Sequence, residues 1–151
     1  MKSNKVSQQY VGIVMVRKDG SVLLQHRDNK PNIGSPNMFA ICGGRKEKAD
    51  KTLKHAAARE LEEETGYIIK TNDLHLLCRD EFDTENGWVT RDFYWCMYDE
   101  EQPIKCLEGQ SIKFYDIENL DGLKFCDPYH KRYLEEASEK NFSLHNRRHI
   151  R

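Results

Sequence analysis

The segment from Asp50 to Gly66 constrains the fold most, because it predicts a single helix with both of its ends marked in the sequence. Asp50 or Thr52 suits the N-cap, since a short polar side chain there can accept a hydrogen bond from a free backbone N–H of the first turn. Residues 56–58 are three alanines, the strongest helix formers. Gly66 stands where a helix often ends in a left-handed residue. We therefore expect a helix over residues 50–65.

One face of this helix carries three carboxylates, those of Glu60, Glu63 and Glu64. Successive residues are about 100° apart on a helix, which places Glu64 and Glu63 within roughly 60° of Glu60, one on each side. The same face holds the apolar residues of the preceding turns, which are Leu53, Ala56 and Ala57. The acidic face is thus the face expected to pack inward.

Carboxylates on an inward-facing stripe require a positive partner, because an uncompensated buried charge strongly destabilises a fold. Arg59 is placed for an i,i+4 pair with Glu63, but one arginine cannot neutralise three acids. A hard divalent cation with oxygen ligands, such as Mg²⁺, is the natural complement. The alternative is an ordinary solvated helix surface, which Glu62 on the opposite side fits well.

Length and composition favour one globular domain and argue against a nucleic-acid or membrane partner. The 151 residues contain 24 Lys and Arg against 25 Asp and Glu, a net charge of −1. No global basic field therefore attracts nucleic acid or an anionic membrane. No apolar run is long enough to span a bilayer, and the five cysteines form no close pair. We expect a protein of the reducing cytoplasm, without disulfides.

The hydrophobic pattern predicts strands on both sides of the acidic helix and a second helix near the end. The expected strands are residues 10–16, 21–27, 38–42, 74–82, 89–97 and 112–115, and the second helix spans residues 128–138. The first two should form a buried hairpin, and the third should end on Gly43 and Gly44. The economical architecture is an α/β fold, a central mixed β-sheet between helices with the acidic helix against it.

The last residues differ from the rest of the chain. Residues 1–139 are expected to form the single domain, whereas residues 140–151 are basic with little apolar periodicity. They suggest a flexible, frayed C-terminal tail. A weak polyanion-binding arm is the alternative.

The glycines and acids together resemble a known signature. Gly43, Gly44 and Glu47, followed by residues 59–67 (RELEEETGY), resemble the Nudix box of Nudix (MutT-like) hydrolases. The second half matches at every specified position. The first half has Asp50 where the box has a glutamate, and one additional residue before Arg59. The resemblance covers about residues 8–138 and implies the α/β/α sandwich of that family.

The resemblance also implies roles for the matching residues. Glu63 and Glu64 would be the principal metal ligands, with Glu60 a further ligand or the base. The Gly43 carbonyl would be another ligand, and Arg59 would hold Glu60. Residues 107–110 (LEGQ) are similar to a segment of MutT-type members, in which Glu108 would be a base or an extra ligand. The alternative for Glu108 is a solvated side chain in an ordinary glycine turn.

Candidate substrate contacts flank these residues. Cations in the neighbouring loops could bind phosphates, and they are Arg27, Lys30, Arg45 and Lys46. Arg27, at the end of an apolar strand, is the preferred one. The alternative for each of the four is an ordinary solvated surface charge. Asp127 lies where MutT-like enzymes place a base-reading residue, but it equally suits the N-cap of the last helix, with Pro128 at the first helical position.

The resemblance implies a pyrophosphohydrolase that uses Mg²⁺, with Mn²⁺ as a substitute, to cleave a nucleoside diphosphate-linked substrate by water attack on phosphorus. A (d)NTP or an oxidised dNTP is the preferred small-molecule substrate. Nucleotide sugars, dinucleoside polyphosphates or a catalytically impaired nucleotide-binding module remain alternatives. RNA binding through the basic tail is a weaker hypothesis, and the sequence leaves homodimer formation open.

Overall fold

A computed structural model describes residues 7–149 of the chain, and the side chains through residue 141. Its centre is a seven-stranded sheet in the order β3-β2-β1-β6-β5, with β4 paired to β1 and β7 paired to β2. The strands are β1 (Gln8–Val16), β2 (Val22–His26), β3 (Phe39–Ala40), β4 (Cys42–Arg45), β5 (His75–Thr84), β6 (Gly87–Met97) and β7 (Ser111–Tyr115).

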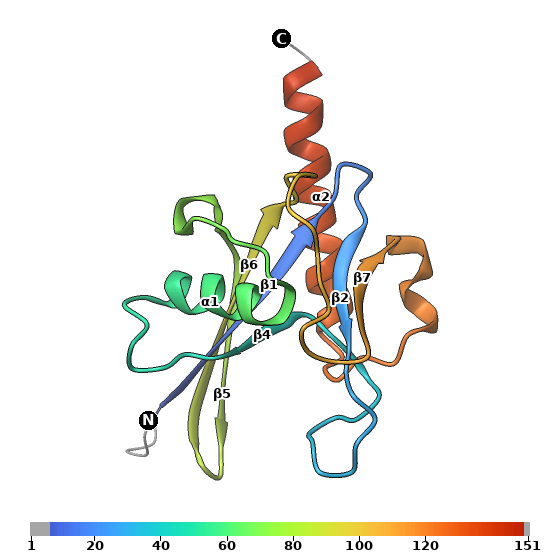
Figure 1. Cartoon of the computed structure of the whole chain (residues 1–151). Coiled ribbons are helices and arrows are strands. Elements are labelled where there is room, and N and C mark those ends of the chain that lie inside the picture. The colour runs from blue at the N-terminus through green and yellow to red at the C-terminus, as the bar shows by residue number, and fades with distance from the viewer. Residues whose placement is uncertain (1–6, 150–151) are drawn as a thin grey trace.

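Strand β1 is the central strand of the sheet. It runs parallel to β6 along its whole length, from Gln8 opposite Val89 to Val16 opposite Met97. It runs antiparallel to β4 and to β2, so the sheet is mixed as expected. The first two strands pair in the antiparallel sense of the predicted hairpin. Figure 1 shows β1 and β6 side by side between the β5 edge and the β2–β7 pair.

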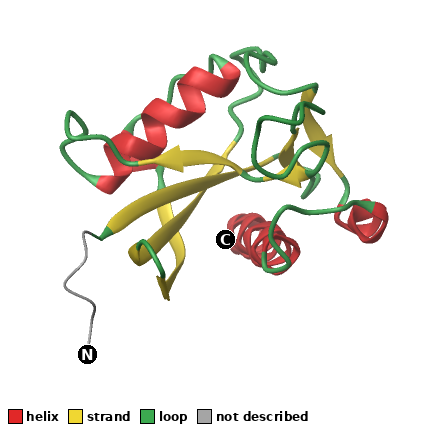
Figure 2. Cartoon of the chain, turned by 90° about the horizontal axis from the view of Figure 1, so that it is seen from below, coloured by secondary structure: helices red, strands yellow, loops and turns green. Residues whose placement is uncertain are grey.

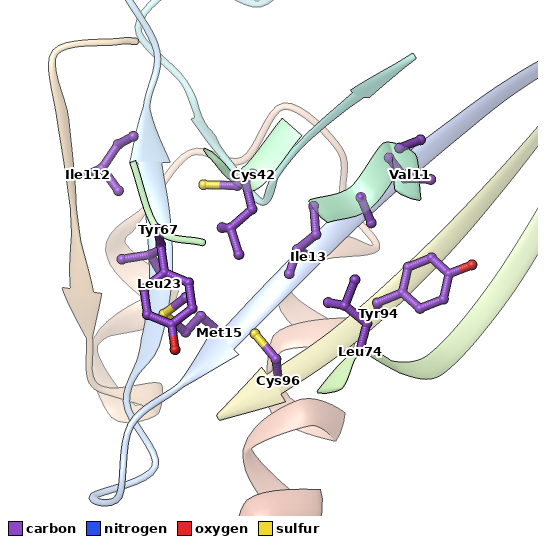
Figure 3. Close-up of a cluster of buried hydrophobic side chains, with 13 residues drawn as sticks. Val11, Ile13, Met15, Leu23, Cys42, Tyr67, Leu74, Tyr94, Cys96 and Ile112 are labelled. Atoms are coloured by element: carbon purple, nitrogen blue, oxygen red, sulfur yellow. The ribbon is translucent and has the colours of Figure 1, made fainter. Parts of the chain in front are cut away.

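The two α-helices cover opposite faces of the sheet, which completes the expected sandwich (Figure 2). They are α1 (Leu53–Thr65) and α2 (His130–His149), accompanied by the short 3₁₀ helices η1 (Thr71–Asp73) and η2 (Ile117–Gly122). The alternation of β1 side chains places Ile13 and Met15 in the core beneath α1, and Val14 and Val16 in the core beneath α2. Figure 3 shows part of the first core, which includes Cys42 of β4, its cross-strand neighbour Ile13 of β1, and Leu23 of β2.

The ends of α1 are those that its sequence indicates. Thr52 is the N-cap, and its hydroxyl accepts a hydrogen bond from the His55 backbone N–H. Gly66 has a φ of 78°, and its N–H donates to the Glu62 carbonyl. Local signals therefore define this helix, which buries Leu61 and Glu64 of its C-terminal half against the sheet.

Several expected boundaries differ from the structure. The helix expected over residues 50–65 begins at Leu53, and the strand expected over residues 38–42 is divided between β3 and β4. Extended structure does not end at Gly43 and Gly44. Strand β4 includes both residues and pairs them with Gly12 and Val11 of β1. A Cβ at Gly43 would lie 2.0 Å from the Val11 carbonyl oxygen, so this close pairing depends on glycine.

Helix α2 also continues beyond the predicted end at residue 138, through most of the segment expected to be irregular. The segment between Tyr129 and His149 contains neither glycine nor proline. Ser138 and Asn141 donate hydrogen bonds to the carbonyls of Gly20 and Arg17, which dock this part of the helix on the β1–β2 turn. Residues 150 and 151 of the expected tail lie outside the described residues.

No helix in the described part of the chain is long and apolar enough to cross a membrane. All five cysteines, each within that part, are free thiols.

Candidate active site

The glycines of β4 lie directly against the acidic half of α1. A Cβ on Gly44 would lie 2.5 Å from the nearest carboxylate oxygen of Glu60. Real Cβ atoms essentially never approach a neighbour so closely. The glycine therefore leaves the space in which the Glu60 carboxylate lies beside the strand.

Glu64 is the most buried of the three acids, with 3% of its surface exposed. Burial raises the pKa of its carboxyl to about 9, and the negative charges of Glu108 and Glu60 act in the same direction. Its Oε1 accepts a hydrogen bond of 3.4 Å from Gln25, whereas its Oε2 is buried without a hydrogen-bond partner. A buried carboxylate oxygen of this kind is a free acceptor for a cation.

Glu60 and Glu63 have different surroundings. Burial raises the pKa of Glu60, and the neighbouring Arg59 opposes this shift. Glu63 is exposed over 56% of its side chain, and both of its oxygens lie 3.1 Å from Arg59 Nη1. The inward stripe predicted from spacing thus holds for Glu64 and largely for Glu60, while Glu63 lies at its solvent edge.

Arg59 joins several of these acids. Its Nη1 lies 3.1 Å from Glu60 Oε1 as well as from Glu63, so the expected contact with Glu60 is present. Its Nη2 donates to the Arg45 carbonyl at 3.0 Å and to Asp50 Oδ2 at 2.9 Å. The guanidinium therefore fixes the loop before α1 and the acids of the helix in one arrangement.

Asp50 has a structural part in this arrangement that sequence reasoning missed. It is 8% exposed, and its carboxylate accepts hydrogen bonds from Arg59 and from the Glu47 backbone N–H. The hydrogen bond from Arg59 holds the pKa of Asp50 below its ordinary value. The sequence does show a single arginine, Arg59, among acids, and Asp50 nine residues before it. Their pairing could not be predicted from this spacing, because only the folded loop brings them together.

Glu108 reaches the site from outside the helix. The Leu107 N–H donates to the Glu64 carbonyl at 2.9 Å, and the Gln110 N–H donates to the His26 carbonyl at 2.7 Å. These bonds hold the segment between α1 and β2. The negative charge of Glu108 contributes to the raised pKa of Glu64. The structure thus brings Glu108 to the acids predicted as metal ligands.

The four residues predicted to bind phosphate differ in their exposure and in the partners of their side chains. Arg45 is exposed and follows the two glycines, whereas Arg27 is half-buried with its Nε donating to the Gly34 carbonyl in its own loop. Lys30 is exposed, and Lys46 Nζ contacts the Glu47 carbonyl. These contacts leave their phosphate-binding role a prediction.

Asp127 lies just before α2, where its Oδ1 accepts the Tyr129 N–H at 2.8 Å. Its other oxygen pairs with Arg91, which also binds both oxygens of Asp80. Sequence reasoning missed Arg91, because only the pairing of distant segments reveals its partners. This ion-pair network borders a pocket of about 450 Å³. The pocket is lined by Asp80, Glu81, Phe82, Arg91, Asp127, Pro128, Tyr129, Arg132 and Tyr133.

The sheet relates this pocket to the acidic site. Tyr10 of β1 has Arg45 of β4 and Arg91 of β6 as its two cross-strand neighbours. Neighbouring strands lie about 4.8 Å apart, so the backbones of the two arginines are separated by roughly 10 Å. Val11, the next residue of β1, packs beneath α1, so Tyr10 and its two arginine neighbours lie on the opposite face of the sheet, the face of α2.

The comparison with protein families decides the identity of the fold and its signature. A family model described as the NUDIX domain matches residues 6–137. The chain belongs to the Nudix family. The expected resemblance is therefore confirmed, and with it a hydrolase that acts on phosphorus anhydrides. No curated protein matches the sequence significantly.

Solved Nudix structures share the fold at low sequence identity. The MutT protein of Methanosarcina mazei is 19% identical, with a TM-score of 0.71 over 92% of this chain and 98% of that one. The NUDIX domain of Shewanella oneidensis NrtR, complexed with ADP ribose, is 20% identical, with a TM-score of 0.72 over 90% and 89%. A bifunctional NMN adenylyltransferase/ADP ribose pyrophosphatase of Francisella tularensis, complexed with AMP and a Mn ion, is 20% identical and has a TM-score of 0.64. That match covers 91% of this chain and 42% of the other.

Nudix hydrolases generally use divalent metals, and the donors of this chain fit one. Among the residues whose side chains the structure describes, no three His, Cys, Asp or Glu side chains are grouped so that they could hold a metal ion. The fit rests on the buried Glu64 Oε2, which has no partner, and on the acids that raise the pKa of Glu64. Carboxylate oxygens are the ligands that Mg²⁺ prefers, and a cation there would relieve the repulsion between Glu60, Glu64 and Glu108.

Proposed function

We propose that this Nudix protein is a Mg²⁺-dependent pyrophosphohydrolase of nucleoside diphosphate-linked substrates, with a (d)NTP or an oxidised dNTP as its preferred substrate. Mn²⁺ would substitute for Mg²⁺. The observation that carries the proposal is the unpartnered Oε2 of the buried Glu64, beside Glu60 and Glu108. A buried carboxylate without a partner is costly unless a ligand completes it.

The residues of the site would divide the work as follows. Glu64, Glu60 and Glu63 would hold the cation, with the Gly43 carbonyl as a further ligand. When bound, Mg²⁺ neutralises phosphate charge and favours the deprotonation of water. Either Glu60 or Glu108 would accept the proton from the attacking water. Arg59 keeps Glu60 in place through its anchors at Asp50 and the Arg45 carbonyl.

Substrate binding would extend from the acids, on the α1 face of the sheet, past the β4 edge to the pocket on the α2 face. Arg45 and Arg27 would contact the phosphates that the cation does not neutralise. The pocket beside Asp127 combines the aromatic rings of Phe82 and Tyr129 with carboxylate acceptors, a composition suited to a nucleobase. Asp127 would read polar atoms of that base while also stabilising the start of α2.

A nucleoside diphosphate derivative, such as a nucleotide sugar or a dinucleoside polyphosphate, is the second candidate substrate. The observation that favours it is the likeness to NrtR complexed with ADP ribose and to the Francisella ADP ribose pyrophosphatase. A catalytically impaired binding module is less well supported. The departure from the box at Asp50 gives Arg59 an anchor and leaves the acids of α1 in position.

The proposal is tested by supplying the purified protein with dNTPs, oxidised dNTPs, nucleotide sugars and dinucleoside polyphosphates, with Mg²⁺ or with EDTA. Products are identified by mass, and ¹⁸O-labelled water reports which phosphorus is attacked. We expect Mg²⁺-dependent release of a nucleoside monophosphate with one ¹⁸O in a phosphate product. Tight nucleotide binding without turnover of any compound would favour the impaired module instead.

A further inference from the structure

Gln25 is a buried polar residue beside the acids that neither the sequence signature nor the mechanism uses. It lies in β2 between Ala40 of β3 and Ile112 of β7, and only 3% of its surface is exposed. A buried amide is costly unless its donors and acceptors are hydrogen-bonded. Its partners therefore indicate why a glutamine lies in this otherwise apolar strand.

Both contacts of the Gln25 amide nitrogen lead to acidic segments. Nε2 donates to Glu64 Oε1 at 3.4 Å and to the backbone carbonyl of Glu108 at 3.2 Å. Glu64 belongs to α1, whereas Glu108 belongs to the segment before β7, so one side chain links two elements that are far apart in the sequence. Because Oε1 of Glu64 is occupied by this donor, Oε2 is the oxygen left without a partner.

The segment of Glu108 is built closely around Gln25. A Cβ on Gly109 would lie 2.7 Å from the His26 carbonyl oxygen and 3.0 Å from Gln25 Cγ, and Gly109 has a φ of 88°. Glycine is thus required both by its conformation and by the approach to Gln25. Hydrogen bonds from Leu107 to the Glu64 carbonyl and from Gln110 to the His26 carbonyl fix both sides of Glu108.

We propose that Gln25 is a positioning residue of the metal site, which orients the Glu64 carboxylate so that Oε2 faces the cation and holds the Glu108 segment beside it. This inference rests on the proposed function. Hydrogen-bond donors that orient carboxylate ligands are a common support of metal sites, and their removal typically lowers metal affinity by about 10–100-fold. A residue that only filled space in β2 would affect folding stability and leave metal affinity unchanged.

The test compares Gln25→Met, which keeps the length of the side chain and removes its donor, with Gln102→Met. Gln102 is the matched control, because its amide also bridges two segments, through the Ile68 N–H and carbonyl, and the carboxylate it contacts is Asp99, which is not part of the proposed metal site. Mn²⁺ affinity is measured without substrate by the electron paramagnetic resonance of free Mn²⁺. Thermal unfolding in EDTA reports the stability of each metal-free variant.

We expect Gln25→Met to weaken Mn²⁺ binding by about tenfold or more, and Gln102→Met to bind Mn²⁺ as the wild type does. Gln25→Asn, one methylene shorter, should also weaken binding, and it decides the matter if Gln25→Met does not fold. Wild-type Mn²⁺ affinity in the folded Gln25 variants would overturn the inference. Glu64→Gln separates the two proposals: if it too leaves Mn²⁺ affinity unchanged, the proposed metal site itself is wrong.

Discussion

Arg59 and Asp50 form a bidentate ion pair across the loop that leads into α1. Arg59 Nε lies 3.0 Å from Asp50 Oδ1, and Arg59 Nη2 lies 2.9 Å from Asp50 Oδ2. The same guanidinium contacts Glu60 and Glu63. The loop and the acidic face of the helix are therefore held by a single side chain. Asp50, at a position where the sequence departs from the Nudix box, is an anchor of this arrangement.

Replacing Asp50 with Asn should lower the free energy of unfolding by about 1–3 kcal/mol at pH 7, because the partly buried Arg59 loses its main charged partner. The pKa of Asp50 is depressed below its ordinary value of 3.8, so its stabilising contribution is present above that pH and is lost as the pH falls through the folded pKa. Urea unfolding at pH 7, 5 and 3 measures the difference, which should shrink at pH 3.

The exposed Asp121 is the matched control, since its ion pair with Lys131 lies at the surface. Asp121→Asn should have nearly wild-type stability. An Asp50→Asn variant with the same small effect would contradict the anchoring role.

Replacing Arg59 with Lys should reduce kcat by about tenfold or more, because one ammonium cannot bind Asp50, Glu60 and the Arg45 carbonyl together. Steady-state kinetics at saturating substrate and Mg²⁺ measure the loss. Arg17→Lys is the control, since Arg17 forms its ion pair with Asp19 in the turn between β1 and β2. Equal kcat values for the two variants would refute the prediction.

Gly44→Ala should displace the Glu60 carboxylate, which lies where the new Cβ would be. We expect kcat to fall by about tenfold or more, as for other losses of support around metal ligands, while the circular dichroism spectrum is retained. Gly122→Ala is the control, because a Cβ there has no neighbour within 4 Å. Full activity of Gly44→Ala would show that Glu60 does not need its present position.

Glu64→Gln should stabilise the metal-free protein at neutral and alkaline pH. The folded pKa of Glu64, about 9, lies above its ordinary value of 4.5. Its contribution to stability is therefore complete below pH 4.5 and is lost as the pH rises toward 9. A neutral glutamine avoids this loss, which amounts to roughly 3 kcal/mol at pH 7.

Thermal unfolding in EDTA between pH 5 and 9 tests this expectation. The difference between Glu64→Gln and the wild type should grow with pH, and saturating Mg²⁺ should reverse it by stabilising only the wild type. A difference that does not change with pH would indicate that Glu64 is ionised without cost in the metal-free protein.

The features of α1 could be predicted from sequence because local interactions determine them. Thr52 and Gly66 mark its ends by their own backbone preferences, and helical periodicity places Glu64 on the buried face. The i,i+4 spacing also predicted the pair between Arg59 and Glu63, which the structure contains. The spacing did not predict that more than half of the Glu63 side chain would be exposed.

The features that were missed depend on contacts between distant segments. β4 continues through Gly43 because β1 offers a partner strand, and α2 continues to Asn141 and beyond because the β1–β2 turn offers carbonyl acceptors. The pairing of Arg91 with Asp127 similarly requires the folded sheet and the start of α2 together. Periodicity and propensity contain no information on such partners.

The most direct test of the central claim is Mg²⁺-dependent turnover by Glu64→Gln, with Glu62→Gln as the control, on the substrate identified from the panel. Glu62 is exposed and lies on the solvent side of α1. We predict that Glu64→Gln reduces kcat by about 100-fold or more, while Glu62→Gln retains wild-type activity and both variants fold. Near wild-type turnover by folded Glu64→Gln would contradict a metal-dependent hydrolase centred on this carboxylate.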